Sequence, residues 1–404
     1  MRTIKDLDVK GQKVLVRVDF NVPLNDQFEI TDDTRMRKAM PTIKYLLDEG
    51  AAVILCSHLG RPQKKKKEDG SINVEKFTLR HLVSHLKSLS GAEVTFAEDC
   101  VGGETELKAE RLTSGEILLL ENTRFHAGES KGDMDMAVKL SRLADIYVND
   151  AFGTAHRAHA STATVAEYFK PENKALGLLM HQEIASADKL LKSPKRPVVA
   201  IVGGAKVSDK IKLLEKLIEV VNHVCVGGGM AYTFKKALGG NIGKSICEDD
   251  YLDLALDILS KAKDLGTEIH LPQDTLIADD FSNDANTDVV DTNHIPDDWE
   301  GLDIGPDTIK RFTDIILDAQ SILWNGPMGV FEFDTFANGT NQIAIAVGEA
   351  TKKGAYSLIG GGDSVAAINK AGLADTVSFV STGGGAMLEY LEGKTLPGIK
   401  AITG

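Results

Sequence analysis

Short apolar runs recur along the whole chain, and each is followed by glycines or charged residues and then by a segment with helical spacing. Strands that are apolar on both faces and alternate with helices indicate parallel sheets of the βαβ type. The runs are Lys13–Val18, Ala51–Cys56, Val94–Ala97, Glu116–Leu120, Asp145–Val148, Val198–Val202, His223–Val226, Glu268–Leu271, Ser321–Trp324, Tyr356–Ile359 and Val377–Val380. The clearest helical segments are Thr34–Leu47, Phe77–Leu89 and Asp209–Val221, the last capped by Ser208. The sequence therefore predicts an α/β fold whose ligands bind beyond the carboxyl ends of the strands.

Two domains are expected, because 404 residues exceed the size at which one hydrophobic core stops growing. The segment Ala175–Pro197 is the predicted connection. Its apolar residues have helical spacing, and Pro194 and Pro197 end the helix because proline lacks an amide donor. Runs before this segment end in Asp, His and Arg, whereas runs after it end in glycines and Lys. We expect residues 1–174 and 198–395 to be domains that hold two anionic ligands on facing surfaces.

Charge and composition exclude several functions. A net charge of -13 argues against a general role at nucleic acids or membrane surfaces, so an anion site must be a local cluster of cations. The four cysteines are scattered, which indicates neither a zinc site nor a disulfide framework. The charged N-terminus is unlike a signal peptide, and no apolar run reaches the roughly 20 residues that span a bilayer. We expect a cytoplasmic location.

Four glycine clusters follow strands of the second half. They are Gly203–Gly204, Gly227–Gly229, Gly360–Gly362 and Gly383–Gly385. Without a Cβ, glycine lets backbone amides approach phosphate oxygens, and the next helix adds partial positive charge at its N-terminus. The clusters predict nucleotide or polyphosphate binding. No strand opens into GxGxxG, and Gly239–Ser245 is not a P-loop because Leu238 stands at the place of its first glycine.

Charged residues beside these clusters are candidate ligand contacts. Lys206 and Lys210 lie at a predicted helix start, where the helix dipole disfavours cations unless an anion is bound; the alternative is two solvated lysines. Asp363 and phosphate oxygens together are typical Mg²⁺ ligands, although Asp363 is equally suited to capping a helix. Glu332 is a candidate acceptor for ribose hydroxyls or a plain surface carboxylate.

The strands of the first half end in cations. These are His58, Arg61, Arg124 and Arg157, with His156 and His159 beside the last, and Arg35 lies near the first strand. Arginine binds carboxylate and phosphate with two hydrogen bonds, so a small acid that carries a phosphate would suit the cluster. Asp19 and Asn21 are candidates for its hydroxyl. Each residue taken alone is more often a surface charge or a core histidine, and His156 and His159 lack an evident third zinc ligand.

Nine motifs in this order resemble those of the phosphoglycerate kinase family. They are RVDFNVP (Arg17–Pro23), SHLGRP (Ser57–Pro62), ENTRF (Glu121–Phe125), NDAFGTAHRAHAS (Asn149–Ser161), GGAKVSDK (Gly203–Lys210), GGGMAYTF (Gly227–Phe234), WNGPMGVFE (Trp324–Glu332), GGGD (Gly360–Asp363) and STGGGA (Ser381–Ala386). The resemblance covers nearly the whole chain. It implies two doubly wound, Rossmann-like domains joined by a helix, with a C-terminal tail, residues 396–404, that returns to the N-terminal domain.

The resemblance also implies ligands and site residues. Phosphoglycerate is expected at Asp19, Asn21, Arg35, His58, Arg61, Arg124 and Arg157. ADP or ATP is expected at Gly204, Lys206, Lys210, Gly228, Gly305, Asn325, Glu332, Gly361, Gly362, Asp363 and Ser364, with Mg²⁺ held by Asp363. The implied reaction is phosphoryl transfer between 1,3-bisphosphoglycerate and ADP in glycolysis, by a monomer whose domains close about a hinge.

A carboxylate is the nucleophile in the ATP-consuming direction, and its ordinary pKa lies far below 7, so no general base is needed. Catalysis then rests on positioning and charge stabilisation, for which Arg35, Lys206 and Gly384 are the candidates. Two alternatives are an acyl-phosphate-forming ligase, for which no third acceptor motif is found, and a non-catalytic nucleotide sensor.

Overall fold

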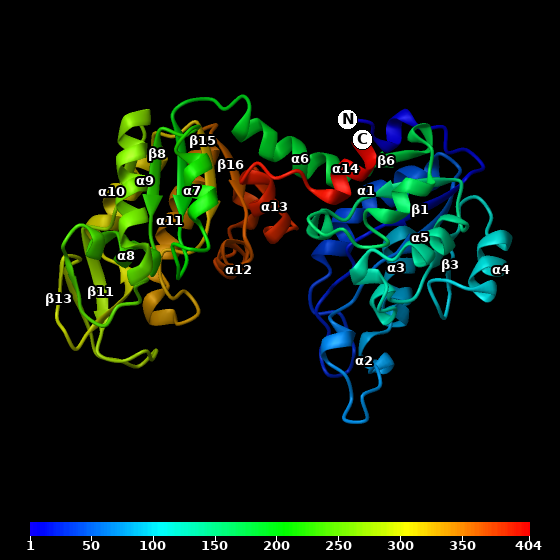
Figure 1. Ribbon diagram of the computed structural model, residues 1–404, viewed down its shortest axis with the longest axis horizontal. Helices are drawn as coiled ribbons and strands as arrows, with labels where there is room; N and C mark the ends of the chain where they lie inside the picture. The colour runs from blue at the N-terminus through cyan, green and yellow to red at the C-terminus, as the bar shows by residue number, and fades with distance from the viewer. The chain divides into compact units, whose positions relative to one another are not determined.

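The computed structural model describes residues 1–404 and divides them into two compact units. Unit 1 comprises Met1–Ala185 and Thr395–Gly404, and unit 2 comprises Ser186–Lys394. Each unit is built around its own six-stranded sheet (Figure 1). None of the helices combines the length and the apolar character needed to cross a membrane.

The sheet of unit 1 is parallel throughout and has the strand order β3-β4-β2-β1-β5-β6. Its strands are β1 (Lys13–Arg17), β2 (Ala52–Cys56), β3 (Val94–Phe96), β4 (Ile117–Leu119), β5 (Ile146–Asn149) and β6 (Lys174–Leu176). The chain leaves β1 toward β2 on one side, whereas β5 pairs with the other side of β1. The strand order therefore changes direction between β1 and β5, and ligands of such sheets bind beyond the carboxyl ends of the strands at this point.

Unit 1 also contains several helices. They are α1 (Thr34–Asp48), α2 (Val74–Phe77), α3 (Val83–Ser90), α4 (Gly103–Arg111), α5 (Met134–Ser141) and α14 (Pro397–Thr403), with the first part of α6 (Leu178–Leu191). Met36 and Ile43 of α1 share a buried core with Val14 and Val16 of β1. The C-terminal helix α14 packs against β6, coloured red beside green in Figure 1. The end of the chain is therefore part of unit 1.

The main sheet of unit 2 is also parallel, with the order β10-β8-β7-β15-β16-β17. Its strands are β7 (Val198–Val202), β8 (His223–Val226), β10 (Glu268–His270), β15 (Ser321–Asn325), β16 (Tyr356–Ile359) and β17 (Phe379–Val380). When the six strands are numbered along the chain, this order is 3-2-1-4-5-6, which is the order of dinucleotide-binding folds. The strand order reverses its direction between β7 and β15. The predicted doubly wound fold is confirmed in both units.

The helices of unit 2 follow its strands. They are α7 (Ile211–Leu217), α8 (Met230–Ala237), α9 (Leu252–Leu265), α10 (Pro306–Leu317), α11 (Asn338–Lys352), α12 (Gly362–Lys370) and α13 (Gly384–Leu391). An antiparallel sheet of β12 (Thr287–Asp291), β11 (Asp274–Ala278) and β14 (Glu300–Ile304) lies beside a pairing of β9 (Asn241–Ile242) with β13 (His294–Ile295). The sequence analysis did not predict this antiparallel sheet, because β12 is mostly exposed and carries no continuous apolar run.

Two predicted helices differ from the structure. The helix expected over Asp209–Val221 begins only at Ile211, and the Ser208 hydroxyl donates to Glu248 at 2.6 Å instead of capping it. The helix expected over Phe77–Leu89 is a 3-10 turn over Leu79–Leu82 followed by α3. In both places a polar side chain near the expected helix start forms hydrogen bonds of its own. These bonds compete with the hydrogen bonds that would extend the helix.

The N-terminus of α6 rests on a buried carboxylate. Asp150 follows β5, and its Oδ1 accepts from the amide of Met180 at 3.0 Å. Burial raises the pKa of Asp150 to about 7. A Cβ on Gly177 would lie 2.1 Å from Asp150 Oδ1, so the close approach of helix and carboxylate requires glycine there. We infer that Gly177 sets the position where α6 leaves unit 1.

We expect Gly177→Ala to lower the free energy of unfolding by about 1–3 kcal/mol, because the added methyl group overpacks a buried site. Gly103→Ala is the matched control: it lies in the first turn of α4, and a Cβ there meets nothing within 4 Å. This control should be neutral or stabilise by up to about 1 kcal/mol. Urea unfolding followed by circular dichroism measures both, and equal stability of the two variants would contradict the role of Gly177.

Candidate functional site

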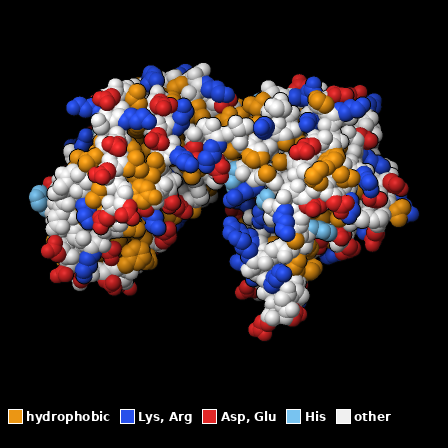
Figure 2. Space-filling view, viewed as in Figure 1, with side chains coloured by type: hydrophobic (Ala, Val, Ile, Leu, Met, Phe, Trp, Pro, Cys, Tyr) orange, Lys and Arg blue, Asp and Glu red, His pale blue; other side chains and the backbone are white.

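Cations gather at the carboxyl end of the unit 1 sheet. Asp19 and Asn21 follow β1, His58 and Arg61 follow β2, Arg124 lies in the turn after β4, and Arg157 follows β5. In the space-filling view, Lys and Arg side chains lie together with His side chains along one margin of this unit (Figure 2). The strand order explains why these cations lie together, because residues more than 100 positions apart in sequence follow neighbouring strands at the same edge of one sheet.

Arg35 is fixed near the end of β1. Its Nη1 donates to the Asn21 carbonyl at 2.8 Å and lies 3.6 Å from Asp19 Oδ1. The Asn21 side chain accepts from the amide of Gly60 at 2.7 Å, which connects the β1 and β2 loops. The Arg35 side chain is still 38% exposed, so the guanidinium has free donors for a ligand.

Arg17 is a residue of this cluster that the sequence analysis did not select. It is fully buried, its Nε donates to Ser161 Oγ at 2.8 Å, and its Nη2 lies 3.2 Å from His58 Nδ1. Ser161 Oγ in turn donates to the buried Glu129 at 2.6 Å. Burial and the charge of Arg17 hold the pKa of His58 well below its usual range, so His58 is neutral at neutral pH. In the sequence, Arg17 ends an apolar strand and begins the motif RVDFNVP, and neither feature marks it as part of the cation cluster.

Arg124 is half-buried, and its Nη1 donates to the Gly60 carbonyl at 2.7 Å. Burial, with the nearby charge of Arg17, lowers its pKa to about 10, and it remains a cation at neutral pH. Arg61 and Arg157 are exposed, and their charges act on Arg124 and His159 respectively. The positive charge of this cluster is therefore larger than the negative charge of the nearby carboxylates. Such a cluster is suited to a small anion with more than one charge.

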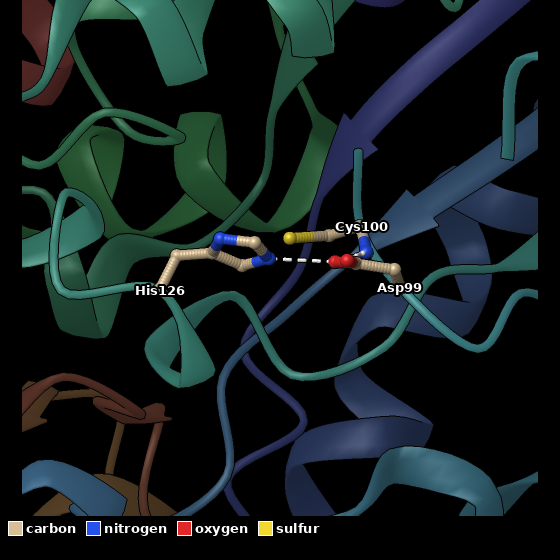
Figure 3. Close-up of side chains that lie close together, drawn as sticks. All are labelled: Asp99, Cys100 and His126. Atoms are coloured by element: carbon tan, nitrogen blue, oxygen red, sulfur yellow. Dashed lines mark hydrogen bonds and ion pairs between the residues drawn. The ribbon is translucent and has the colours of Figure 1, made fainter. Parts of the chain in front are cut away.

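A cluster of polar side chains supports the turn that holds Arg124. His126 ends this turn, and its Nε2 lies 2.6 Å from Asp99 Oδ1, with the thiol of Cys100 beside the ring (Figure 3). Burial raises the pKa of the Cys100 thiol well above its usual value, so it is no activated nucleophile. The cluster anchors the loop and adds no reactive group.

Unit 2 contains a cavity of 650 Å³ at the carboxyl ends of β7 and β15, where its strand order reverses. One part of the wall is glycine backbone, including Gly204 and Gly228, with three carboxylates, Glu300, Glu332 and Asp363. The other part is apolar and includes Tyr232, Ile246, Phe281, Leu302, Met328, Val330 and Phe333. A polar end and an apolar slot fit a molecule with phosphates and a flat ring, and Asp363 is placed to hold a divalent cation between itself and phosphate oxygens.

Close backbone packing shapes the polar end. Gly228 has a φ of +67°, and a Cβ there would lie 2.7 Å from the amide nitrogen of Gly204, so two loops meet without side chains. Lys210 Nζ donates to Asn325 Oδ1, and Asn325 Nδ2 donates to the Gly360 carbonyl at 3.1 Å. Burial lowers the pKa of Lys210, while nearby Asp363 opposes this shift. Lys206 is exposed in the same loop as Gly204.

The remaining predicted residues lie around the cavity rather than along its wall. Gly361 and Gly362 begin α12, and Gly384 at the start of α13 lies against Gly362. Ser364 is fully buried, and its hydroxyl accepts from the amide of Gly326, so it holds a loop in place.

One predicted position lies away from the cavity wall. Gly305 precedes α10 and packs against the Asp274 carboxylate, and it does not line the cavity. Gly301 lines it instead, four residues earlier on β14. The sequence analysis did not select Gly301, Tyr232 and Phe281. Two signals were available: Tyr232 lies within the motif GGGMAYTF, and Phe281 is an aromatic residue in a polar segment.

The basic cluster of unit 1, the cavity of unit 2 and the doubly wound units are suited to a phosphotransferase, and comparison with known proteins supports this class. The family model "Phosphoglycerate kinase" matches residues 4–394. The phosphoglycerate kinase of Porphyromonas gingivalis is 51% identical over all of both chains, and the cytosolic phosphoglycerate kinase 3 of Arabidopsis thaliana is 52% identical, covering 99% of this chain and 97% of its own. The solved phosphoglycerate kinase of Coxiella burnetii has a TM-score of 0.87 at 40% identity and covers 99% of this chain and 98% of its own. The chain belongs to the phosphoglycerate kinase family.

The basic cluster should make stability depend on pH. Burial lowers the pKa of His159 to about 4, against the opposing charge of Glu129 and with the support of Arg17, Arg124 and Arg157. An unfolded histidine binds a proton below about pH 6.5, so falling pH between 6.5 and 4 favours the unfolded chain. The free energy of unfolding should therefore fall between pH 7 and pH 5, and we expect it to fall less in His159→Gln than in the wild type. Urea unfolding at the two pH values measures this difference.

His294→Gln is the control, because this histidine is 80% exposed. It should follow the wild type at both pH values. An equal pH dependence in His159→Gln and the wild type would show that the folded chain protonates His159 as readily as the unfolded chain.

Proposed function

We propose that this kinase catalyses the reversible, Mg²⁺-dependent transfer of a phosphoryl group between 1,3-bisphosphoglycerate and ADP, giving 3-phosphoglycerate and ATP. The observation that supports this reaction most directly is the pair of different anion sites in one chain of this family. One is lined by guanidinium and imidazole groups, and the other is lined by backbone and opens into an apolar slot. The predicted monomer and cytoplasmic location stay predictions.

In this proposal the acid substrate binds unit 1. Arg35, Arg61, Arg124 and Arg157 bind its phosphate and carboxylate by paired hydrogen bonds, and the neutral His58 adds one more. Asp19 and Asn21 bind the hydroxyl. Arg17 touches no ligand in this scheme; it positions His58 through their 3.2 Å contact. The buried Glu129, which is connected to Arg17 through Ser161, offsets part of the charge of Arg17.

The nucleotide is proposed to occupy the cavity of unit 2. Amides near Gly204 and Gly228 face its phosphates, Lys206 and Lys210 supply positive charge, and the apolar slot takes the base. Asp363 would hold Mg²⁺, which neutralises charge on the phosphate oxygens when bound.

The chemistry needs position and charge rather than proton transfer. The attacking group in the ATP-consuming direction is a carboxylate that is already ionised at neutral pH. Arg35, Lys206 and the backbone amides at the start of α13, near Gly384, are proposed to stabilise the charge on the moving phosphoryl group. This division of labour explains why no carboxylate–histidine pair is required at the site.

The proposed reaction and the role of Arg35 are tested together in a coupled assay for ADP formation from MgATP and 3-phosphoglycerate. The wild type should form ADP without any further acceptor. Arg35→Ala should reduce turnover by about 10³-fold or more, as for other arginines that contact a transferring phosphoryl group. Its affinity for MgATP should change little, because the proposed nucleotide site uses no residue of unit 1.

Arg37→Ala is the matched control, because Arg37 lies on the same helix, is 63% exposed and pairs with Asp33 at 2.8 Å. It should keep wild-type turnover. Equal losses of turnover and nucleotide affinity in Arg35→Ala would contradict its proposed position. ADP formation only with a third substrate would indicate a ligase, and nucleotide binding with no turnover would indicate a sensor.

Since the two proposed ligands bind different units, we propose that the units close about the segment 175–197 to bring them in line and exclude water. Small-angle scattering should show a smaller radius of gyration with 3-phosphoglycerate and MgADP together. Either ligand alone should have little effect. A radius that is unchanged with both ligands present would rule out closure.

A further inference from the structure

Two histidines and a glutamate meet at the edge of the unit 2 sheet, away from the cavity. His223 begins β8, and Glu268 and His270 lie on β10, the edge strand. The parallel register pairs Glu268 with His223. None of the three lines the nucleotide cavity or belongs to the family motifs quoted above.

The three donor atoms have the spacing of a coordination sphere. His223 Nδ1 lies 3.1 Å from His270 Nε2, and Glu268 Oε2 lies 3.6 Å from each of these nitrogens. A point equidistant from three atoms so spaced lies about 2.0 Å from each, which matches the usual Zn–N and Zn–O distances of about 2.0–2.2 Å. An ion can therefore enter with little movement of the ligands.

We propose that His223, Glu268 and His270 form a site for a divalent transition-metal ion, with Zn²⁺ as its best occupant. Imidazole and carboxylate ligands suit Zn²⁺, and three protein ligands leave a fourth position for water. A cavity of 460 Å³ lined by Glu268, His270 and Thr267 gives the ion and its water access from solvent. The bound ion would link the short edge strand β10 to β8.

Arg311 opposes the ion and tunes its affinity. Its Nη2 lies 3.0 Å from His270 Nδ1, and a guanidinium only donates hydrogen bonds. When Nε2 binds a metal, Nδ1 carries the ring proton, so the Arg311 side chain must turn away. It also adds a positive charge near the ion, as does Lys263 at the cavity wall. Removal of the Arg311 charge should therefore tighten binding.

The cluster of Asp99, Cys100 and His126 in unit 1 is the alternative metal site (Figure 3). It fits less well, because Asp99 Oδ1 and His126 Nε2 are only 2.6 Å apart, whereas two ligands of a tetrahedral Zn²⁺ are separated by about 3.3 Å. Asp99 Oδ1 also accepts from the amide of Cys100 at 2.6 Å. This carboxylate is already used within the loop.

The test is titration calorimetry of the full chain, without a histidine tag or nucleotide, with ZnCl₂ as the probe. The wild type should bind one equivalent with a Kd of about 10 μM or tighter. Glu268→Gln and His223→Gln should weaken binding by about tenfold or more. Glu268 is 69% exposed, so its variant should fold even where the histidine variant does not. Arg311→Gln should bind more tightly than the wild type.

Two controls separate this site from others. His294→Gln removes an exposed histidine of the same unit, and His126→Gln removes a ligand of the alternative cluster; both should bind Zn²⁺ like the wild type. Co²⁺ should give the visible absorption of tetrahedral coordination in the wild type and not in Glu268→Gln. No binding near 10 μM by the wild type, unchanged binding in Glu268→Gln, or loss of binding in His126→Gln would each overturn the proposal.

Discussion

The contact of the Arg17 guanidinium with Ser161 and His58 is the interaction on which unit 1 depends. A buried charge is costly unless it is hydrogen-bonded and offset by an opposite charge. Ser161 provides the hydrogen bond to Arg17. It also connects Arg17 to Glu129, which provides the opposite charge. The same contacts join residues that follow or end β1, β2 and β5, so an electrostatic requirement also fixes the relative positions of the loops that carry the other cations.

The proposed anion site of unit 2 is built mainly from backbone groups instead of charged side chains. Its loops approach each other through backbone, as at Gly228 and Gly204, and the wall of the cavity presents few charged groups. Amides in fixed loops lose little side-chain entropy when a ligand binds, whereas long arginine side chains must be ordered. The contrast fits the proposed ligands, since a nucleotide offers a phosphate chain to follow and a small acid offers only its two ends.

The sequence predicted the central strands of the two parallel sheets well because these strands are buried on both faces and largely apolar, as in Val198–Val202, whose bounds were predicted without error. It failed where a residue acts through distant partners. Arg17 has the sequence surroundings of a core strand, and Ser208 has those of a cap, yet tertiary partners decide both roles. Gly301 was missed because its strand β14, Glu300–Ile304, is interrupted by Glu300 and Asp303 and has no continuous apolar run to reveal it.

The same reasoning explains why a metal site at His223 was beyond the sequence analysis. Ligands of the familiar zinc motifs are close in sequence, and the scattered cysteines gave no such motif. Here the donors are brought together by strand pairing, which sets Glu268 beside His223 and places His270 two residues further on the same strand. Side chains two positions apart on a strand share one face. A parallel sheet therefore assembles ligands at its edges by the same register that assembles the cations and glycines at the carboxyl ends of its strands.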